Sequence, residues 1–319
     1  MNIETIKNRS KILSIIRDFF TEKNYLELET PTLSRTLIPE SNIEVFKTDI
    51  LNPYSTTEQS YLIPSPEVWL KQFLSENHCN IFEISRCFRN SEQSGKHHNP
   101  EFTMVEYYSM GFTHLDTLEL TVELLNYINF KYPESKLSRE STILTMDQAF
   151  IKYAGFSLKD NYSINDLQKQ AKKLNIYIEK SDDWETSFNR IFLDKVEPNI
   201  PRDKNVFLTD FPSNIKTLAK NIPGTPWAQR WELYINGIEC GNCYTEENDP
   251  TLVSQYFTIE NEAKKDALVK HNTDPNYYKI FNNFPNCSGG AIGVDRLVMA
   301  ILGLNNIGDV ILYPYKTDK

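Results

Sequence analysis

The sequence predicts an α+β fold built on a mainly antiparallel β-sheet. Its strand-like segments fall into groups separated by long helical stretches, instead of alternating one for one with helices as a parallel βαβ fold requires. A second observation is the dipeptide Asn236-Gly237 between two strand-like runs, the strongest short-range signal for a tight antiparallel hairpin. Both observations favour antiparallel pairing of neighbouring strands.

The first part of the chain is expected to contain two helices and three strands. Ile6, Leu13, Ile16 and Phe20 recur at helical spacing, which predicts an amphipathic helix. The next segment alternates like a strand until it meets Pro31, which suits a strand end or a sheet edge. The predicted elements are a helix at 4–23, a strand at 25–33, strands at 81–89 and 102–110 joined by a long polar loop, and a helix at 114–130.

The remainder of the chain is expected to return to the sheet after a helical excursion. Residues from about 135 to 200 have helical character and predict a helical insertion. The later predicted elements are strands at 205–210, 230–245 and 287–294, with helices near 251–269 and at 295–304. Apart from the insertion, we expect a single domain over residues 1–319.

Composition limits the classes of partner and compartment. The 319 residues are 40% hydrophobic and 24% charged, which is typical of a soluble globular protein with a sizeable core. No apolar run reaches the roughly 18 residues of a spanning helix, and the N-terminus lacks a signal-peptide pattern, so we expect a cytoplasmic protein with no membrane partner. The net charge of −9 and the absence of a basic run argue against tRNA as a partner.

The five cysteines are an odd number in a long chain and indicate reduced thiols. Cys240 and Cys243 form a lone CxxC pair, whereas a zinc site needs a second pair of ligands. We therefore expect ordinary packing or lining residues at these two positions.

The segment 82–108 carries the most informative group of polar residues. It supplies Arg89 at a strand end, His98 in the loop, and Phe102 and Glu106 on the returning strand. An arginine fork can bind two phosphate oxygens, an aromatic ring can cover adenine, and an acid can bind a metal or a substrate amine. On these residues alone, a surface hairpin with solvated charges remains the alternative.

The segment 230–249 adds two carboxylates. A two-residue turn at Asn236-Gly237 and the period-2 alternation of strands put Glu232 and Glu239 on one face, together with Tyr234. The register that this turn predicts pairs Ile235 with Ile238 and Tyr234 with Glu239. Two carboxylates on one face can hold Mg²⁺ that bridges phosphates, while a solvated outer face is the alternative interpretation.

The Gly-rich segment 288–303 ends in a predicted helix. Glycines allow the backbone to approach a ligand closely, and the helix N-terminus offers unpaired N–H groups. Arg296 lies in the first helical turn, where a cation is unfavourable for the helix dipole, so a phosphate partner is more plausible than a structural role.

In this order, the three segments resemble conserved motifs of the class II aminoacyl-tRNA synthetases, and of the lysyl subgroup in particular. FRN…HHNPEFTMVEYY at 88–108 is similar to motif 2, GIECGN at 237–242 to the GxExGNG segment, and AIGVDR at 291–296 to motif 3. ELETP with Pro31 is similar to motif 1, which in that family builds a homodimer interface. The resemblance covers nearly the whole chain and implies the class II catalytic fold.

The resemblance implies ATP and Mg²⁺ as cofactors. It implies that Arg89 binds the α-phosphate, His98 and Arg296 the γ-phosphate, and that Phe102 stacks on adenine. The expected catalytic residues are Arg89 and Arg296, and the expected metal ligands are Glu232 and Glu239. The full set of expected ATP-binding residues is Arg89, Asn90, Ser91, His98, Asn99, Phe102, Glu239, Cys240, Gly293 and Arg296.

The resemblance also implies a lysine-type substrate. A ligand with two amines needs acids at both ends of its pocket, because a buried ammonium group is costly unless it is paired. In lysyl enzymes, the acid matching Glu67 receives the backbone amine, and those matching Glu106 and Glu246 receive the side-chain amine. The expected substrate-binding residues are Ser65, Pro66, Glu67, Glu106, Tyr108, Asn242, Glu246 and Ala291.

The acceptor is inferred from what the sequence lacks. Full-length lysyl enzymes carry an N-terminal barrel that binds the anticodon, and this sequence leaves no room for it before the first helix. The chain thus resembles the elongation factor P–lysine ligase family, which transfers activated lysine or (R)-β-lysine to a lysine side chain of the factor. Ala291 stands where tRNA-charging enzymes usually carry glycine, and its methyl group could reshape the pocket towards β-lysine.

Two departures from the family pattern keep alternatives open. Ser91 replaces the glutamate of the RNE triplet, and a GNGF-like turn becomes Gly241-Asn242-Cys243-Tyr244, with a thiol expected near the substrate. The alternatives are a truncated lysyl enzyme that charges tRNA, an ammonia ligase of the asparagine synthetase type, and a non-catalytic amino-acid-binding paralogue.

Overall fold

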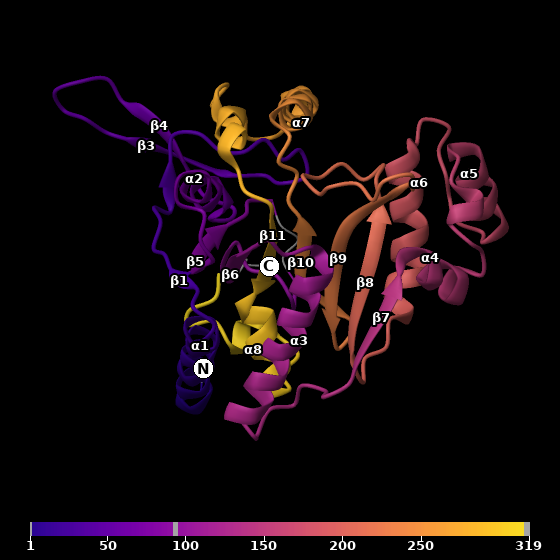
Figure 1. Cartoon of the computed structure of the whole chain (residues 1–319), viewed down its shortest axis with the longest axis horizontal. Coiled ribbons are helices and arrows are strands. Elements are labelled where there is room, and N and C mark those ends of the chain that lie inside the picture. The colour runs from indigo at the N-terminus through magenta and orange to yellow at the C-terminus, as the bar shows by residue number, and fades with distance from the viewer. Residues whose placement is uncertain (1, 92–94, 316–319) are drawn as a thin grey trace.

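The computed structural model describes residues 2–91 and 95–315, and a large β-sheet runs through its centre (Figure 1). The sheet has eight strands in the order β1-β5-β6-β11-β10-β9-β8-β7. All neighbouring strands pair antiparallel except the edge pairs β1–β5 and β7–β8, which are parallel. The predicted α+β fold on a mainly antiparallel sheet is therefore confirmed.

The strands of the large sheet are β1 (Leu26–Glu27), β5 (Ile81–Phe88), β6 (Glu101–Met110), β7 (Ser141–Thr145), β8 (Asn205–Pro212), β9 (Trp227–Ile235), β10 (Ile238–Thr245) and β11 (Cys287–Gly293). A second sheet has the order β2-β4-β3 and consists of β2 (Leu33–Ser34), β3 (Phe46–Ile50) and β4 (Glu58–Leu62). The α-helices are α1 (Ile3–Glu22), α2 (Glu67–Asn77), α3 (His114–Lys131), α4 (Met146–Ala149), α5 (Ile164–Lys173), α6 (Trp184–Ile191), α7 (Pro250–Ala263) and α8 (Val294–Leu302).

One face of the sheet packs against α1, α3 and α8, and this contact forms the main hydrophobic core. The alternation of side chains along β6 shows why: Val105 and Tyr107 are buried in this core, whereas Glu106 and Tyr108 point to the other face. The helices supply apolar residues at helical spacing. Their buried residues in this core include Ile12, Ile16 and Phe20 of α1, Leu124 and Ile128 of α3, and Leu297 and Ile301 of α8.

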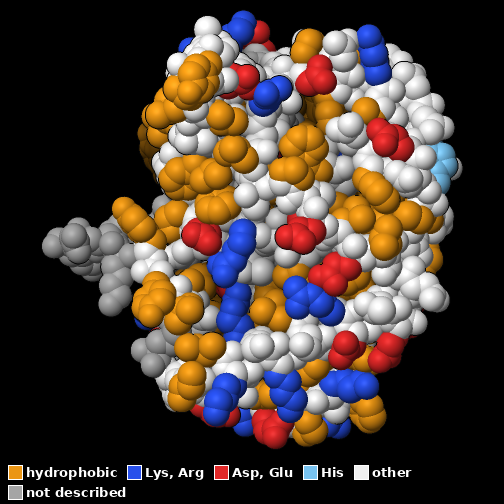
Figure 2. Space-filling view, turned by 90° about the vertical axis from the view of Figure 1, so that its left-hand side faces the viewer, with side chains coloured by type: hydrophobic (Ala, Val, Ile, Leu, Met, Phe, Trp, Pro, Cys, Tyr) orange, Lys and Arg blue, Asp and Glu red, His pale blue; other side chains and the backbone are white. Residues whose placement is uncertain are grey.

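Two smaller cores flank the main one. The segment between β7 and β8 folds as α4, α5, α6 and short 3-10 and π-helical turns, which pack on β8 (Figure 1). On the other flank, α2, α7 and the small sheet enclose a third core. The side of the molecule that includes the small sheet carries groups of hydrophobic side chains interspersed with charged ones (Figure 2). No helix of the described residues is long and apolar enough to cross a membrane.

The hairpin predicted at Asn236-Gly237 is confirmed. Both residues have positive φ, 54° and 74°, as a type I′ turn requires. The register is the predicted one, with Ile235 opposite Ile238 and Tyr234 opposite Glu239. A β-bulge between Glu239 and Gly241 was not predicted, and it shifts the pairing of the following residues.

Several predicted elements were wrong in extent. The single strand at 25–33 is two short strands in different sheets, because the chain leaves the large sheet after Glu27 and Pro31 cannot donate a ladder hydrogen bond. The helix near 251–269 ends as an α-helix at Ala263 and continues only as a 3-10 turn. Strands β3, β4 and β7 and helix α2 were not predicted from the sequence.

Candidate active site

The register of the sheet brings the candidate residues into rows. Ala291 of β11 lies opposite Glu106 of β6 on one side and Asn242 of β10 on the other, and Asn242 lies opposite Glu232 of β9. Since side chains at paired positions point to the same face, these four residues form one row on the face away from the main core. Residues distant in the sequence thus share one surface.

A second row lies two positions further along the strands. It pairs Tyr108 with Gly289, Gly289 with Tyr244, and Tyr244 with Arg230. Glycine is required in this row, because a Cβ at Gly289 would lie 2.4 Å from Oε1 of Glu246 and 2.6 Å from the Tyr108 ring. Because Gly289 of β11 has no side chain, there is space beside it for the large side chains of Tyr108 on β6 and Tyr244 on β10.

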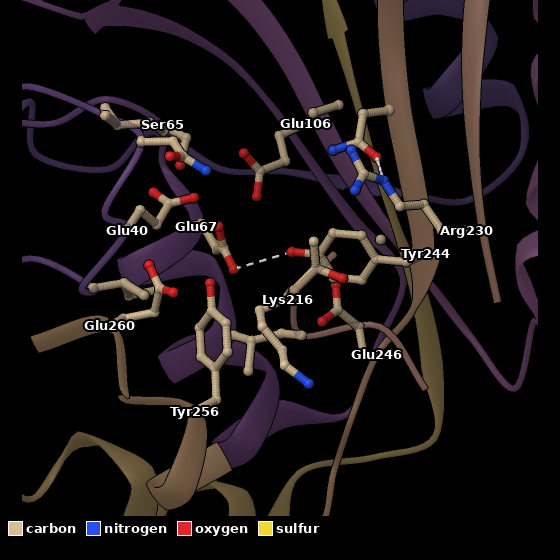
Figure 3. A pocket seen from close by; sticks show the side chains of 18 of the residues that line it. Glu40, Ser65, Glu67, Glu106, Lys216, Arg230, Tyr244, Glu246, Tyr256 and Glu260 are labelled. Atoms are coloured by element: carbon tan, nitrogen blue, oxygen red, sulfur yellow. Dashed lines mark hydrogen bonds between the residues drawn. The ribbon is translucent and has the colours of Figure 1, made fainter. Parts of the chain in front are cut away.

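Above these rows lies a cavity of about 360 Å³ that is rich in carboxylates (Figure 3). The carboxylates come from the loop before β3, from α2, β6, the end of β10, α6 and α7. The acids that line the cavity are Glu40, Glu67, Glu106, Glu185, Glu246 and Glu260. Such a cavity attracts a cation and repels a ligand whose side chain carries a carboxylate.

Burial changes the protonation of these acids. The pKa of Glu106 lies well above its usual range because the carboxyl is buried and the charge of Glu67 is nearby, although Tyr108 Oη donates to Glu106 Oε1 at 2.7 Å. Burial also raises the pKa of Glu246, to about 7, against the opposing effect of the Lys71 ammonium. A ligand ammonium would favour the ionised form of both carboxyl groups.

A second cavity, of about 170 Å³, adjoins the first. Arg89, Met104, Asn242 and Ala291 line both cavities. The guanidinium of Arg89 lies 5.3 Å from the centre of the Phe102 ring, and its Nε atom is buried with no hydrogen-bond partner among the described residues. A buried donor without a partner is costly, so this atom fits an anionic oxygen of a ligand.

Arg296 also lines the second cavity. Its Nη1 donates to the carbonyl of Glu239 at 2.7 Å and its Nε donates to the carbonyl of His97 at 3.1 Å. These bonds hold the guanidinium across the bulge of β10 and the loop between β5 and β6. The preceding Asp295 accepts from the backbone N–H of Thr103 at 2.7 Å, which fixes the start of α8 against β6.

Two further carboxylates lie at the hairpin. Glu232 is buried, and it accepts from Arg230 Nη2 at 2.7 Å and from Tyr234 Oη at 2.8 Å. Burial, followed by the charge of Glu239, raises the pKa of Glu232 to about 7. The nearby Glu197 carboxyl also has a raised pKa, from burial and then from Glu239. Carboxylate oxygens are donors that Mg²⁺ prefers, and the charge of Glu239 acts on Glu232, so this pair could contribute two ligands. Among the described residues, no group of three or more His, Cys, Asp or Glu side chains is placed to hold a metal ion.

Comparison with known proteins identifies the family of this chain. The model of the class II tRNA synthetases (D, K and N) matches residues 2–317. The chain belongs to this family. Among its relatives are the elongation factor P–(R)-β-lysine ligases of Vibrio atlanticus, 32% identical, and of Avibacterium paragallinarum, 33% identical. The alignments cover 98% of this chain and 96% and 95% of the two relatives.

Most of the predicted site residues of this class II chain line one of the two cavities. The first is lined by Ser65, Glu67, Glu106, Tyr108, Asn242, Glu246 and Ala291, and the second by Arg89, His98, Asn99, Phe102, Glu239, Cys240, Gly293 and Arg296. Four predicted residues line neither. Pro66 precedes the first turn of α2, Asn90 and Ser91 lie in the loop after β5, and Glu232 lies beneath Arg230.

The expected thiol near the substrate was wrong. Residues 241–244 belong to strand β10 and do not form a turn, so successive side chains point to opposite faces. Asn242 and Tyr244 face the first cavity, whereas Cys243 is buried in the main core with its Sγ 3.2 Å from Ser288 Oγ. Cys243 therefore belongs to the core that packs behind the site, and its thiol does not line the first cavity.

Several residues of the site were not predicted from the sequence. Arg230 could have been found, because it lies two positions before Glu232 on the same strand face. Lys71 follows Glu67 by one helical turn, which is also a visible signal once α2 is assigned. Glu40 comes from the loop before β3 and Glu260 from α7, and the packing of these two segments brings both acids to the cavity.

Proposed function

We propose that this class II chain activates lysine or (R)-β-lysine with ATP and transfers it to a lysine side chain of elongation factor P. The observation that carries the proposal is the pair of adjoining cavities. One has an arginine donor that lacks a partner among the described residues and lies beside an aromatic ring, and the other is lined by six carboxylates. The first suits a nucleotide phosphate and base, and the second suits a diamine.

In the activation step, Arg89 would bind the α-phosphate, and Arg296 and His98 the γ-phosphate. Glu232 and Glu239 would hold Mg²⁺, which neutralises phosphate charge when bound. An oxygen of the amino-acid carboxylate attacks the α-phosphorus, the bond to pyrophosphate breaks, and an aminoacyl-adenylate forms. Arg89 lines both cavities, so it would position the two reacting groups and stabilise the charge that develops between them.

In the transfer step, the neutral amine of an acceptor lysine attacks the carbonyl carbon of the adenylate. The bond from that carbon to the AMP oxygen breaks, an amide forms, and the amine loses a proton to solvent. Three features support elongation factor P as the acceptor: the printed names of the relatives, the net charge of −9, and the match of these ligases over 95–96% of their own length. A tRNA acceptor would need a basic surface for phosphate contacts.

The amino-acid pocket separates this proposal from an ammonia ligase of the asparagine synthetase type. That reaction needs cations around a side-chain carboxylate, whereas carboxylates outnumber cations around this cavity.

A homodimer through the region of β1 and β2 is part of the proposal, and exposed apolar side chains there, such as Leu26 and Leu33, support it.

Amino-acid-dependent ATP–pyrophosphate exchange tests the activation step. We expect exchange with lysine or (R)-β-lysine, and none with aspartate, asparagine or norleucine, which lack the second amine. Exchange with aspartate, or with norleucine as readily as with lysine, would contradict a diamine pocket. A charging assay with tRNA tests the alternative acceptor, and there we expect no product.

A further inference from the structure

Lys71 is a buried cation directly beneath the amino-acid cavity. It lies on α2, its side chain is 0% exposed, and its Nζ lies 2.6 Å from Oε1 of Glu67 and 2.8 Å from Oε2 of Glu246. The same Nζ lies 5.5 Å from the centre of the Tyr244 ring, and Tyr244 Oη donates to Glu67 Oε1 at 3.4 Å.

The two carboxylates that Lys71 joins belong to different parts of the fold. Glu67 opens helix α2, and Glu246 follows the end of β10, with its Oε1 close to Gly289. Both line the cavity proposed to bind a diamine. Each ion pair uses one oxygen of its carboxylate, so each carboxylate retains a second oxygen that can accept from a ligand ammonium.

We propose that Lys71 is a positioning residue for the amino acid: its ammonium ties Glu67 to Glu246 and thereby sets the distance and the charge of two acids that receive the substrate amines. This inference rests on the proposed function. It assigns Lys71 no contact with the reacting atoms, and it predicts that the residue acts on amino-acid affinity and not on ATP affinity.

Electrostatics supports the assignment. Burial alone would lower the pKa of Lys71, but the charges of Glu246 and Glu67 outweigh it and hold the pKa well above its usual range. Lys71 thus stays charged at neutral pH. Its charge in turn opposes the effect of burial on Glu246, so removal of the cation would raise the pKa of Glu246 further above about 7.

Other groups around Glu246 do not replace this cation. Lys220 is the second positive charge that acts on Glu246, and it donates to Asn286 at 3.0 Å. The remaining titratable neighbours add negative charge when they ionise. They are Glu67 of α2, Glu106 and Tyr108 of β6, Cys243 and Tyr244 of β10, Tyr277 before β11 and Cys287 of β11.

The test compares Lys71→Gln, Lys71→Arg and the wild-type protein by ATP–pyrophosphate exchange between pH 6 and 9. Lys195→Gln is the control, since Lys195 also forms an ion pair, with Asp194 at 2.8 Å, and lines neither cavity. We expect Lys71→Gln to raise the KM for lysine by about tenfold or more at pH 7, the loss of one charged contact. Its KM for ATP should stay within about twofold, and its acid limb should move to higher pH.

Lys71→Arg keeps the charge and should recover most of the amino-acid affinity, with the acid limb at the wild-type pH. Lys195→Gln should leave the KM for lysine at the wild-type value. A Lys71→Gln protein with an unchanged KM and pH profile, or an arginine variant no better than glutamine, would overturn the inference.

Circular dichroism and thermal melting establish that each variant is folded. If Lys71→Gln does not fold, the arginine variant decides alone, and a displaced acid limb in that variant would overturn the inference. Wild-type protein that shows no exchange with any diamino acid would overturn the proposed function, and the inference with it. The wild-type and variant measurements therefore separate the two failures.

Discussion

At the scale of single residues, the strongest expectation concerns Arg89. We expect Arg89→Ala to slow lysine-dependent ATP–pyrophosphate exchange by at least the ~1.5–3 kcal/mol of one charged hydrogen bond, because the guanidinium lines both cavities. Exchange kinetics measure the effect. Arg86→Ala is the matched control: Arg86 lies on the same strand, its side chain is 54% exposed, and it pairs with Glu101 at 3.4 Å. Equal rates for both variants would remove Arg89 from the proposed chemistry.

The sequence contained enough to propose most residues of the site, for a physical reason. Arg89, Phe102 and Arg296 belong to short segments whose spacing is set by strands and by a helix start, so local pattern predicts their neighbours. Lys71 and Glu40 depend on how α2 and the loop before β3 pack, which local pattern does not encode. The metal, catalytic and binding roles of these residues remain predictions.

At the scale of elements, strand β11 is the most sensitive part of the site. Gly289→Ala should raise the KM for lysine and leave the KM for ATP nearly unchanged. The new methyl group would lie 2.4 Å from Glu246 and 2.6 Å from Tyr108, on the amino-acid side of the sheet. Displacement of one charged partner costs about 1.5–3 kcal/mol, or roughly 10- to 150-fold in KM.

Steady-state exchange kinetics with each substrate varied in turn measure both constants for Gly289→Ala. A rise in the KM for ATP equal to that for lysine would indicate general distortion of the sheet. An unchanged KM for lysine would show that Glu246 does not contact the amino acid.

The hairpin at Asn236-Gly237 was predictable in turn, register and face, because the dipeptide dictates the turn and the turn dictates the pairing. The bulge after Glu239 was not predictable from this dipeptide; at the bulge, Arg296 of another element donates to the Glu239 carbonyl. Cys243 was wrongly predicted to lie near the substrate because residues 241–244 were interpreted as a turn. They belong to strand β10, in which successive side chains point to opposite faces.

At the scale of the whole molecule, the site buries several carboxyl groups away from water. Glu40, Glu232 and Glu246 have pKa values raised to about 7 from an ordinary value of 4.5, with burial as the largest cause in each case. A carboxyl whose pKa is raised on folding stabilises the protein below its unfolded pKa, and this contribution is lost as the pH rises through the folded pKa.

The free energy of unfolding of the ligand-free protein should therefore fall between about pH 5 and about pH 7.5. His271 opposes this trend only below its ordinary value of 6.5, because burial lowers its pKa to about 4. Urea titrations at several pH values measure the slope, and Glu232→Gln should make it shallower. A stability that rises steadily over this range would contradict the raised pKa values.

The fold itself was predictable in class because strand grouping and hairpin chemistry are local signals. The order of the strands was not, since β1 and β7 join the large sheet in parallel at its two edges through long connections. That order is what places Glu106, Ala291, Asn242 and Glu232 in one row. The single-domain and homodimer assignments remain predictions.

The mass of elongation factor P tests the central claim most directly. The factor is incubated with the wild-type protein, ATP and either lysine or (R)-β-lysine, with the Arg89→Ala protein as the control. We predict that the factor gains the mass of one lysine-type residue only with ATP and wild-type protein, at an acceptor lysine side chain. An unchanged mass with both isomers, under conditions where the wild-type protein catalyses lysine-dependent exchange, would contradict the proposed acceptor.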